Sequence, residues 1–167
     1  MPIRVDEAQL EAKGRPAAIA LALYTLRAMD AWRQQVHSYD CAMIMVAVVA
    51  ITAERLLRTE IEPEQARLEN PVDLATLQKC NIASIAHATG LNRESTRRKV
   101  NDLIGRGLLT RLDDGTIFFQ DGLTQRPVVR ELIRRQLIDL TATVNRLLKI
   151  GVLAEGENGS VRRAVSF

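Results

Sequence analysis

The feature that most constrains the fold is the pattern of residues 82–122, which read IASIAHATGLNRESTRRKVNDLIGRGLLTRLDDGTIFFQDG. This pattern predicts a short helix, a glycine turn, a second and basic helix, and then a β-hairpin. Ile82, Ile85 and Ala86 recur at helical spacing and define the first helix. Gly90 follows where a helix end favours a residue with left-handed dihedral angles. Two helices joined by a short glycine-containing turn form a helix-turn-helix.

The second predicted helix has one apolar face and one polar face. Asn92 is a favoured N-cap, and the helix is expected to run from Arg93 to about Gly105 or Gly107, where glycine would stop it. At about 100° per residue, one face collects the side chains that should pack inward. These are Thr96, Val100, Leu103 and Ile104. The opposite face and its flanks carry Arg93, Glu94, Ser95, Arg97, Arg98 and Asn101. The exposed face is therefore polar and rich in arginine.

Residues 108–112 and 117–120 predict two short strands around residues 113–116, which read DDGT. An Asp-Gly pair between β-prone runs is a strong hairpin signal. A hairpin that directly follows such a helix is the wing of a winged helix. Because its tip is acidic, the tip is a poor clamp for phosphate, and Arg111 near the base is the better candidate contact.

Charge is unevenly distributed, although the formal net charge is only +3. Residues 92–111 contain six basic and two acidic residues, whereas residues 54–73 contain six acidic and three basic ones. Basic charge is thus concentrated around the second helix, which is the electrostatic footprint expected of a DNA-binding protein. Taken alone, the charge also fits a solvated helix face. The turn and the hairpin together favour nucleic acid.

The turn and second helix resemble those of bacterial winged helix-turn-helix transcriptional regulators. Residues 90–98, GLNRESTRR, are similar to the recognition helix of the cyclic-AMP receptor family. In that family the matching side chains read bases, which implies base reading by Arg93, Glu94 and Arg98. Thr96 stands where the family usually has an aliphatic residue. The preceding sequence predicts helix and not a cyclic-nucleotide barrel, so that family's effector is not carried over. The layout is closer to small dimeric regulators of the MarR type.

We therefore expect residues 92–104 to enter the major groove of double-stranded DNA. Arginine can bind guanine bidentately, and a carboxylate can accept a hydrogen bond from cytosine. Arg97, Lys99 and Arg111 are expected to contact phosphates. The full set of expected DNA-binding residues is Asn92, Arg93, Glu94, Ser95, Arg97, Arg98, Lys99, Asn101 and Arg111.

No motif in the sequence indicates catalysis. Cys41 and Cys80 lie in or beside apolar segments without CxxC spacing, so they are expected to be reduced core residues, with redox sensing as the alternative. His37 and His87 are isolated and suggest no metal site. A phosphate-binding glycine loop and a nucleophile elbow are both missing. We expect a protein that is not an enzyme, with no catalytic residue, no metal and no cofactor.

The sequence before the helix-turn-helix predicts further helices. Residues 1–16 predict a loose lead-in that lacks the apolar core of a secretory signal, and Pro16 suits the first position of a helix. Residues 17–36 then predict a helix, and Asp40 is a plausible N-cap for the next one. Residues 41–53 are nearly all apolar, but this run is shorter than the roughly twenty residues needed to cross a bilayer. A helix that is apolar all round is buried, either as the first helix of the winged-helix core or between two chains.

Residues 59–71 predict an acidic connecting loop. Downstream, Pro127 should open a long helix that ends near Ile150. Apolar residues alternate along it at spacings of four and three, which gives a short a/d-like seam. The seam consists of Ile133, Leu137, Leu140, Val144 and Leu147. It fits docking on its own domain or on a second subunit, and the extra apolar surface of the N-terminal helices favours a dimer. The tail from Glu155 is expected to be mobile.

The sequence thus predicts a mainly α protein with a small β wing, in which N- and C-terminal helices flank a winged helix-turn-helix domain. The expected parts are a lead-in and helix (1–39), the DNA-binding domain with its acidic loop (40–122), a dimerisation helix (123–152) and a mobile tail (153–167). The expected function is sequence-specific transcriptional regulation by a bacterial, cytoplasmic homodimer that does not contact membranes. Whether it has a small-molecule effector is left open. The alternative is a winged-helix module that binds other proteins in a larger assembly.

Overall fold

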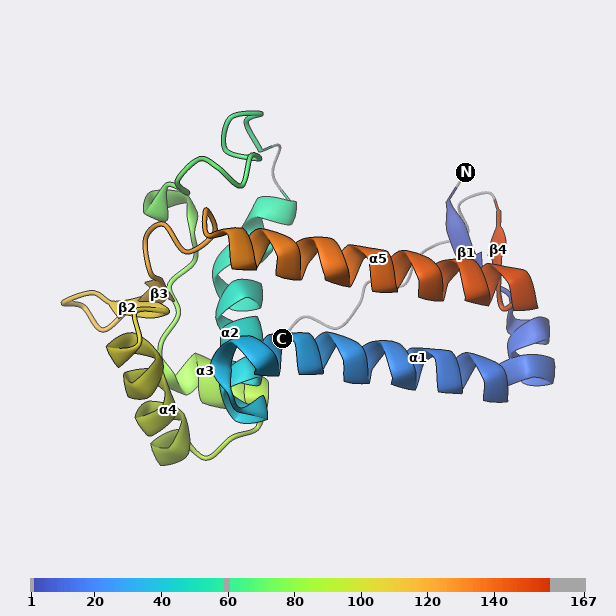
Figure 1. The fold of residues 1–167 in the computed structure, drawn as a ribbon, viewed down its shortest axis with the longest axis horizontal. Coiled ribbons are helices and arrows are strands. Elements are labelled where there is room, and N and C mark those ends of the chain that lie inside the picture. Colours follow the sequence, from blue (N-terminus) through green and yellow to red (C-terminus); the bar gives the residue numbers. More distant parts are fainter. Residues whose placement is uncertain (1, 59–60, 157–167) are drawn as a thin grey trace. The chain divides into compact units, whose positions relative to one another are not determined.

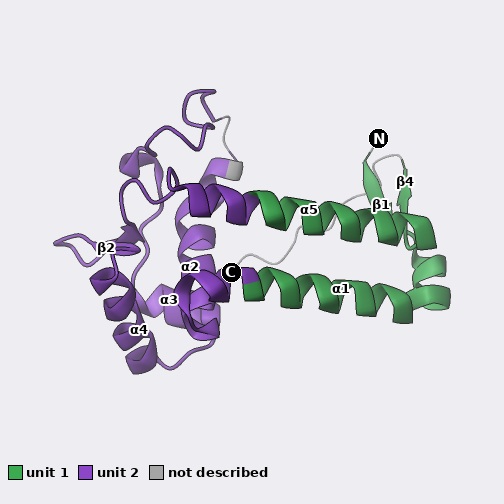
Figure 2. Ribbon diagram, in the orientation of Figure 1, with its two compact units in different colours: residues 1–30, 134–167 green, residues 31–133 purple. Residues whose placement is uncertain are grey.

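The computed structural model describes residues 2–58 and 61–156. These residues form five α-helices and two small antiparallel sheets of two strands each (Figure 1). The expectation of a mainly α fold with a β-hairpin between helices is confirmed. The chain divides into two compact units (Figure 2). We call residues 31–133 the core unit, and the described residues of 1–30 and 134–167 the terminal unit.

Helix α2 (Tyr39–Ala53) is the centre of the core unit. It packs against α3 (Ile82–Thr89), α4 (Arg93–Gly105) and strand β3 (Ile117–Phe119). The residues of α2 that are buried are Cys41, Ala42, Ile44, Met45, Ala47, Val48 and Thr52. The hydroxyl of Thr52 donates to Val48 O at 2.7 Å, so this polar group is paired inside the apolar layer. The prediction of a buried apolar helix is confirmed.

The start of α2 differs from the expectation. Ser38 is the N-cap, since its side chain accepts a hydrogen bond from Cys41 N at 3.5 Å, and the prediction of Asp40 as the cap is wrong. The preceding residue, His37, has a left-handed φ of 62° and turns the chain between α1 and α2. The helix therefore begins before Asp40, which lies in the first turn, where the helix dipole favours a negative charge.

The connection between α2 and α3 has little regular structure. It contains two 3-10 turns, η1 (Glu54–Leu57) and η2 (Leu74–Thr76), separated mainly by turns and bends. The predicted acidic loop is confirmed over residues 61–71, whereas residues 59–60 lie outside the described part of the chain. Gln125 Nε2 donates to Asn70 O at 2.8 Å and so fastens the loop to the segment that precedes α5.

The predicted hairpin is also confirmed. Strand β2 (Leu109–Arg111) pairs with β3, so that Leu109 lies opposite Phe119. Gly115 has a φ of 82° at the turn, a conformation that glycine adopts without strain. Ile117 N donates to Cys80 O at 2.7 Å, so the segment before α3 covers the other edge of β3. The hairpin is therefore hydrogen-bonded to the segment that leads into α3.

The terminal unit begins with a strand that the sequence did not predict. Strand β1 (Ile3–Val5) pairs with β4 (Leu153–Glu155) in antiparallel register. Helix α1 (Glu7–Val36) follows directly, so the prediction of a loose lead-in is wrong. Lys13 has non-helical dihedral angles and kinks the helix. Pro16 lies in the first turn after this kink, where its missing N–H leaves no helical hydrogen bond unmade.

Helix α5 (Pro127–Ile150) has the bounds expected from the sequence. Within the terminal unit, Lys13 Nζ donates to Ile150 O at 3.0 Å and satisfies a carbonyl at the end of α5. The buried cluster of this unit is small and consists of Ala17, Ala20, Leu147 and Val152. Of the predicted tail, residues 153–155 form β4, and residues 157–167 lie outside the described residues.

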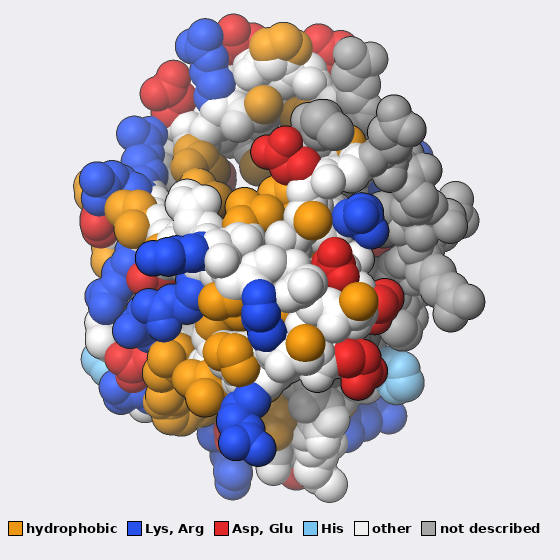
Figure 3. All heavy atoms as spheres, turned by 90° about the vertical axis from the view of Figure 1, so that its right-hand side faces the viewer, with side chains coloured by type: hydrophobic (Ala, Val, Ile, Leu, Met, Phe, Trp, Pro, Cys, Tyr) orange, Lys and Arg blue, Asp and Glu red, His pale blue; other side chains and the backbone are white. Residues whose placement is uncertain are grey.

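Large apolar side chains of the terminal unit are exposed. In the predicted seam, Leu137 is 58% and Leu140 is 40% exposed, and Leu147 is buried. The part of α1 in this unit exposes Ile19, Leu21, Leu23 and Leu26. On the face drawn in Figure 3, hydrophobic side chains reach the surface among Lys and Arg side chains. The terminal unit therefore combines a small core with much uncovered apolar surface.

Among the described residues, no single helix is long and apolar enough to cross a membrane. Helix α1 and residues 39–56 are joined by a bend of 100°. Only when they are counted together do they have the length and apolar composition of a membrane-spanning segment.

The inner face of α4 gives a stability prediction. Leu103 is fully buried, so Leu103→Ala should lower the free energy of unfolding by about 2–5 kcal/mol, because truncation leaves a cavity. Urea unfolding followed by circular dichroism measures this loss. The control is Leu112→Ala, at a position that is 42% exposed, where the change should stay within about 0.5 kcal/mol. Equal losses of unfolding free energy at the two positions would mean that Leu103 does not lie on a buried face of α4.

Candidate nucleic-acid interface

Local hydrogen bonds build the turn between α3 and α4. Asn81 and Ser84 form a capping box at the start of α3, in which each side chain accepts from the other residue's backbone N–H. The sequence analysis missed this box, although the Asn-x-x-Ser spacing before an apolar run was its signal. Gly90 ends α3 with a φ of 69°, and Asn92 caps α4 by accepting from Glu94 N at 2.9 Å. The predicted roles of Gly90 and Asn92 are confirmed.

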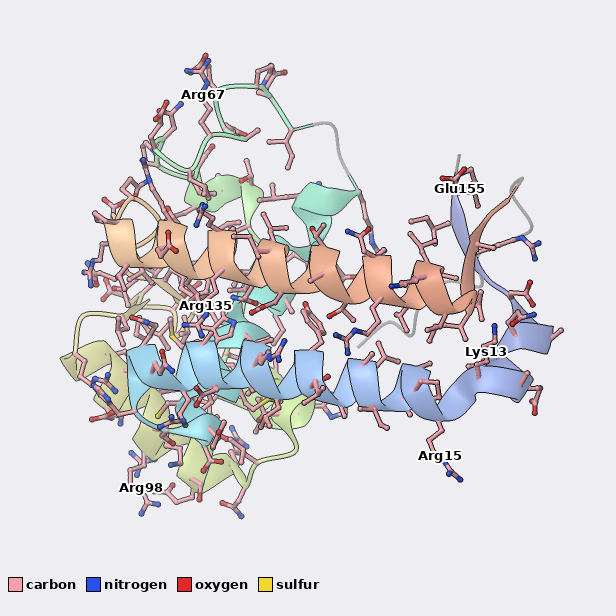
Figure 4. All side chains as sticks on the ribbon, turned by 45° about the vertical axis from the view of Figure 1, so that its right-hand side comes forward. Lys13, Arg15, Arg67, Arg98, Arg135 and Glu155 are labelled. Carbon is pink, nitrogen blue, oxygen red and sulfur yellow. The ribbon has the colours of Figure 1, made fainter. Side chains whose placement is uncertain are left out.

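Helix α4 has the two faces that its periodicity predicted. Thr96, Val100 and Leu103 are fully buried, and the hydroxyl of Thr96 donates to Asn92 O at 3.0 Å. The predicted contact residues that are exposed on α4 or at its cap are Asn92, Arg93, Glu94, Arg97, Arg98 and Asn101, and Ser95 is half-buried. Figure 4 shows the side chain of Arg98 projecting away from the ribbon. Helix α4 therefore presents a polar, arginine-containing surface on one side, while its opposite side packs into the core.

Two predicted contact residues pair with each other on this surface. Arg97 Nε donates to Glu94 Oε2 at 3.0 Å, and Arg97 Nη2 donates to Glu94 Oε1 at 2.6 Å. The hydrogen bonds from Arg97 lower the pKa of Glu94, and the same bonds raise the pKa of Arg97. Both groups are therefore charged at neutral pH, and the bidentate fork orients the guanidinium at the start of α4.

Two predicted phosphate contacts also have partners within the core unit. Lys99 Nζ lies 3.2 Å from Asp40 Oδ2, and its side chain is only 26% exposed. Arg111 Nη2 donates to Asn101 Oδ1 at 2.9 Å. Lys99 thus ties α4 to α2, and Arg111 ties the hairpin to the exposed face of α4. The structure brings Arg111 to the predicted surface and turns Lys99 toward α2.

Arg106 has a positioning role that the sequence analysis missed. Its Nη1 donates to Val36 O at 2.9 Å and its Nη2 to Gln35 O at 3.3 Å. Nη1 also lies 3.5 Å from Asp102 Oδ2. This side chain fastens the C-terminal end of α4 to the last turn of α1, inside the core unit. No local pattern in the sequence identifies such a contact, because its acceptors are backbone carbonyls far away along the chain.

The acidic tip of the hairpin is partly neutralised. Asp114 Oδ1 accepts from Thr116 N at 2.9 Å, and Asp114 Oδ2 lies 3.0 Å from Lys79 Nζ. Hydrogen bonds from Thr116, followed by that from Lys79, hold the pKa of Asp114 well below its usual range. The tip therefore remains anionic at neutral pH, and its charge is matched by Lys79 before any phosphate approaches.

The remaining candidate groups do not gather into a second site. Cys41 and Cys80 are buried and free, as expected for core residues, and burial raises the pKa of the Cys80 thiol. His87 is exposed on α3. Within residues 2–58 and 61–156, no cluster of His, Cys, Asp or Glu side chains could hold a metal ion.

Comparison with protein families, with curated proteins and with solved structures finds no match for this chain. The case for a nucleic-acid interface therefore rests on the residues and the geometry described above.

The ion pair between α2 and α4 gives a second prediction. A double-mutant cycle with Asp40→Asn and Lys99→Met should give a coupling energy of about 0.2–1 kcal/mol, because the pair is partly exposed to solvent. Urea unfolding of the wild type, both single variants and the double variant measures it. The same cycle on Arg58 and Asp40, which form no ion pair with each other, should give no coupling. A coupling energy of zero for Lys99 would mean that this side chain is not held by α2.

Proposed function

We propose that this protein is a sequence-specific, DNA-binding transcriptional regulator of the winged helix-turn-helix type, which acts as a homodimer in the bacterial cytoplasm. Helix α4 would enter the major groove, and the β2–β3 hairpin would lie beside it as the wing. One observation carries the proposal. Helix α4 combines an inner face, on which Thr96, Val100 and Leu103 are fully buried, with an exposed outer face on which basic and hydrogen-bonding side chains are concentrated.

The order of elements supports this use of α4. A DNA-reading helix-turn-helix places its second helix in the groove while the first helix supports it. Here α3 and α4 are joined by the turn at Gly90, and α2 packs against both. Asn92 caps α4, so its first turn is ordered and its N-terminal end is available to base edges. The hairpin follows α4 after Gly107, which has a φ of 64°.

The predicted site divides into three groups of residues. We assign base reading to Arg93, Glu94 and Arg98. All three are exposed, and they match the base-reading positions of the cyclic-AMP receptor family, which the turn and α4 resemble. Asn92, Ser95 and Asn101 would add short-range hydrogen bonds in the groove. Arg97, Lys99 and Arg111 would contact phosphates, although each has a partner in the free protein. These three side chains would have to exchange an internal acceptor for a phosphate. Arg98, one of the exposed residues assigned to base reading, is therefore chosen for the substitution below.

The exposed apolar side chains of the terminal unit support the dimer. Its buried cluster contains two alanines and two larger residues, whereas seven large aliphatic side chains on its two helices are at least 40% exposed. These are Ile19, Leu21, Leu23, Leu26, Leu137, Ile138 and Leu140. Uncovered apolar surface of this extent drives association, and closed two-fold pairing is the commonest way to cover it.

A salt titration tests the proposed function against the alternative of a protein-binding module. A dimer that neutralises six or more phosphates should lose roughly 10³-fold or more in DNA affinity between about 50 and 200 mM salt. Fluorescence anisotropy with a labelled random duplex measures this dependence. A flat response, or no binding at low salt, would contradict DNA binding and favour contacts with other proteins.

A pair of substitutions tests the assignment of the reading helix. Arg98→Ala should weaken binding to the preferred site by about 1–3 kcal/mol and relax selection at one base position in each half-site. The preferred site comes from in vitro selection on random DNA. The matched control is Arg67→Ala, because Arg67 is also an exposed arginine of the core unit and projects from the loop at the other end of that unit (Figure 4).

Binding by the Arg67 variant should be nearly unchanged. If the two variants lose affinity equally and select the same motif as the wild type, α4 does not read the bases.

The proposed dimer links the apolar seam to the DNA site. Leu140→Glu would place a charge in the interface, so the subunits should separate, and light scattering should report a monomer. Leu112→Glu, at a similarly exposed leucine of the hairpin, should leave the mass unchanged. The selected site should be an inverted repeat with half-site centres about 10–10.5 base pairs apart, or a multiple of that. A wild-type monomer at micromolar concentration would refute the dimer.

A further inference from the structure

The core unit contains a cavity of about 460 Å³. Its wall is formed mainly by aliphatic and aromatic side chains from several parts of the unit. Trp32 lies at the end of α1, Val49 on α2, Leu74 in the connecting loop, Phe119 on β3 and Leu132 on α5. The cavity is partly open to solvent, and its volume falls within the roughly 300–1,000 Å³ typical of small-molecule sites.

The polar groups of the wall restrict what the cavity can hold. The charged residues in it are Asp121 and Arg126, both exposed, and Arg126 Nη2 donates to Gly107 O at 3.3 Å. No charged group of the wall is buried, so a charged group held within the apolar part of the cavity would lose its hydration without a buried partner in return. The cavity therefore suits an uncharged and mainly apolar molecule.

One buried acceptor in the wall lacks a donor. Gln125 Nε2 donates to Asn70 O, and a carbonyl can only accept, so this bond identifies which terminal atom of the Gln125 amide is the nitrogen. Its Oε1 is buried and has no hydrogen-bond partner. A buried acceptor left unpaired is costly. The terminal torsion of glutamine is broad, so a modest rotation of the amide would let this oxygen accept from a hydroxyl group in the cavity.

We propose that this cavity binds an uncharged, mainly apolar small molecule that carries one hydroxyl group, and that this molecule is the effector of the regulator. The second part rests on the proposed function. Its structural basis is the connection between the wall and α4. Leu108 in the wall follows α4 and donates its N–H to Leu103 O at 3.0 Å, and Val36 in the wall accepts from Arg106 at the end of α4. A ligand that moves either residue acts on the reading helix.

Binding is tested first, without DNA. The protein has a single tryptophan, Trp32, and it lies in the wall, so its emission reports occupancy. The probes are octanol, octanoate and octylammonium, which share one alkyl chain and differ in charge. Titration of the full chain at neutral pH, followed by Trp32 emission and calorimetry, should show octanol binding at least ~10-fold more tightly than either ion. No octanol binding, or equal binding of an ion, would overturn the ligand class.

Matched variants of α2 locate the site. Val49 and Met43 are both 38% exposed, but Val49 lines the cavity and Met43 does not. Val49→Phe should weaken octanol binding by about 5-fold or more, because the added ring occupies the space, whereas Met43→Phe should not. Phenylalanine keeps Trp32 as the only tryptophan. Equal effects would place the octanol elsewhere. A change of oligomeric state in Val49→Phe with octanol binding unaltered would instead assign the cavity to a second copy of the chain.

A comparison of two ligands tests whether Gln125 selects the hydroxyl group. Octanol should bind about 2–10-fold more tightly than hexyl methyl ketone, which offers an acceptor and no donor. Gln125→Leu should remove this difference and leave the ketone affinity unchanged. A preference for octanol that survives in the variant would mean that Gln125 does not select the hydroxyl group.

The effector role is tested last, with the selected DNA site. Saturating octanol should change the DNA affinity of the wild type by about 5-fold or more, the range of typical coupling energies, and should change that of Val49→Phe less. DNA binding that does not respond to bound octanol would overturn the effector role. Absence of DNA binding altogether would overturn the proposed function and leave the ligand site established by the first titration.

Discussion

The burial of α2 is the interaction on which the core unit depends. Ile44 and Val48 have no exposed surface, and α3, α4 and the hairpin strand β3 all pack on the same helix. A close-packed layer of this kind leaves little freedom for α4 to rotate about its axis. The outward direction of the polar face is therefore a consequence of the apolar sequence of α2, which contributes no side chain to the predicted DNA contacts. Asp40, at the start of α2, adds an ionic link to Lys99.

The parts that could be predicted from the sequence are those in which local preference and tertiary packing agree. The inner face of α4 followed from helical periodicity, because Thr96, Val100 and Leu103 are buried by neighbours that need an apolar stripe. Pro127 and Gly151 mark the ends of α5 by their own backbone chemistry, and Gly151 has a φ of 85°. The hairpin followed from its Asp-Asp-Gly turn.

The features that could not be predicted depend on partners far along the chain. Strands β1 and β4 are three residues long and exist only because each supplies the other's hydrogen bonds. Ser38 caps α2 instead of Asp40 because His37 adopts a positive φ, which no local pattern announces. In the candidate site, Lys99 and Arg111 count as basic charge in the sequence, but the fold gives both of them internal acceptors. Composition alone therefore overstates the number of basic side chains that are free to bind phosphate.

The pairing of β1 with β4 also has a consequence for how the chain is made. The core unit is one continuous segment, so all of its contacts become possible once residue 133 has been synthesised. Strand β1 precedes the core unit in the chain, whereas its partner β4 follows the core unit and is synthesised after it. Domains fold as units during synthesis, so the order of assembly follows from the topology, with the core unit first. Until the end of α5 and β4 have been made, Ala17 and Ala20 of α1 lack Leu147 and Val152, which complete the buried cluster of the terminal unit.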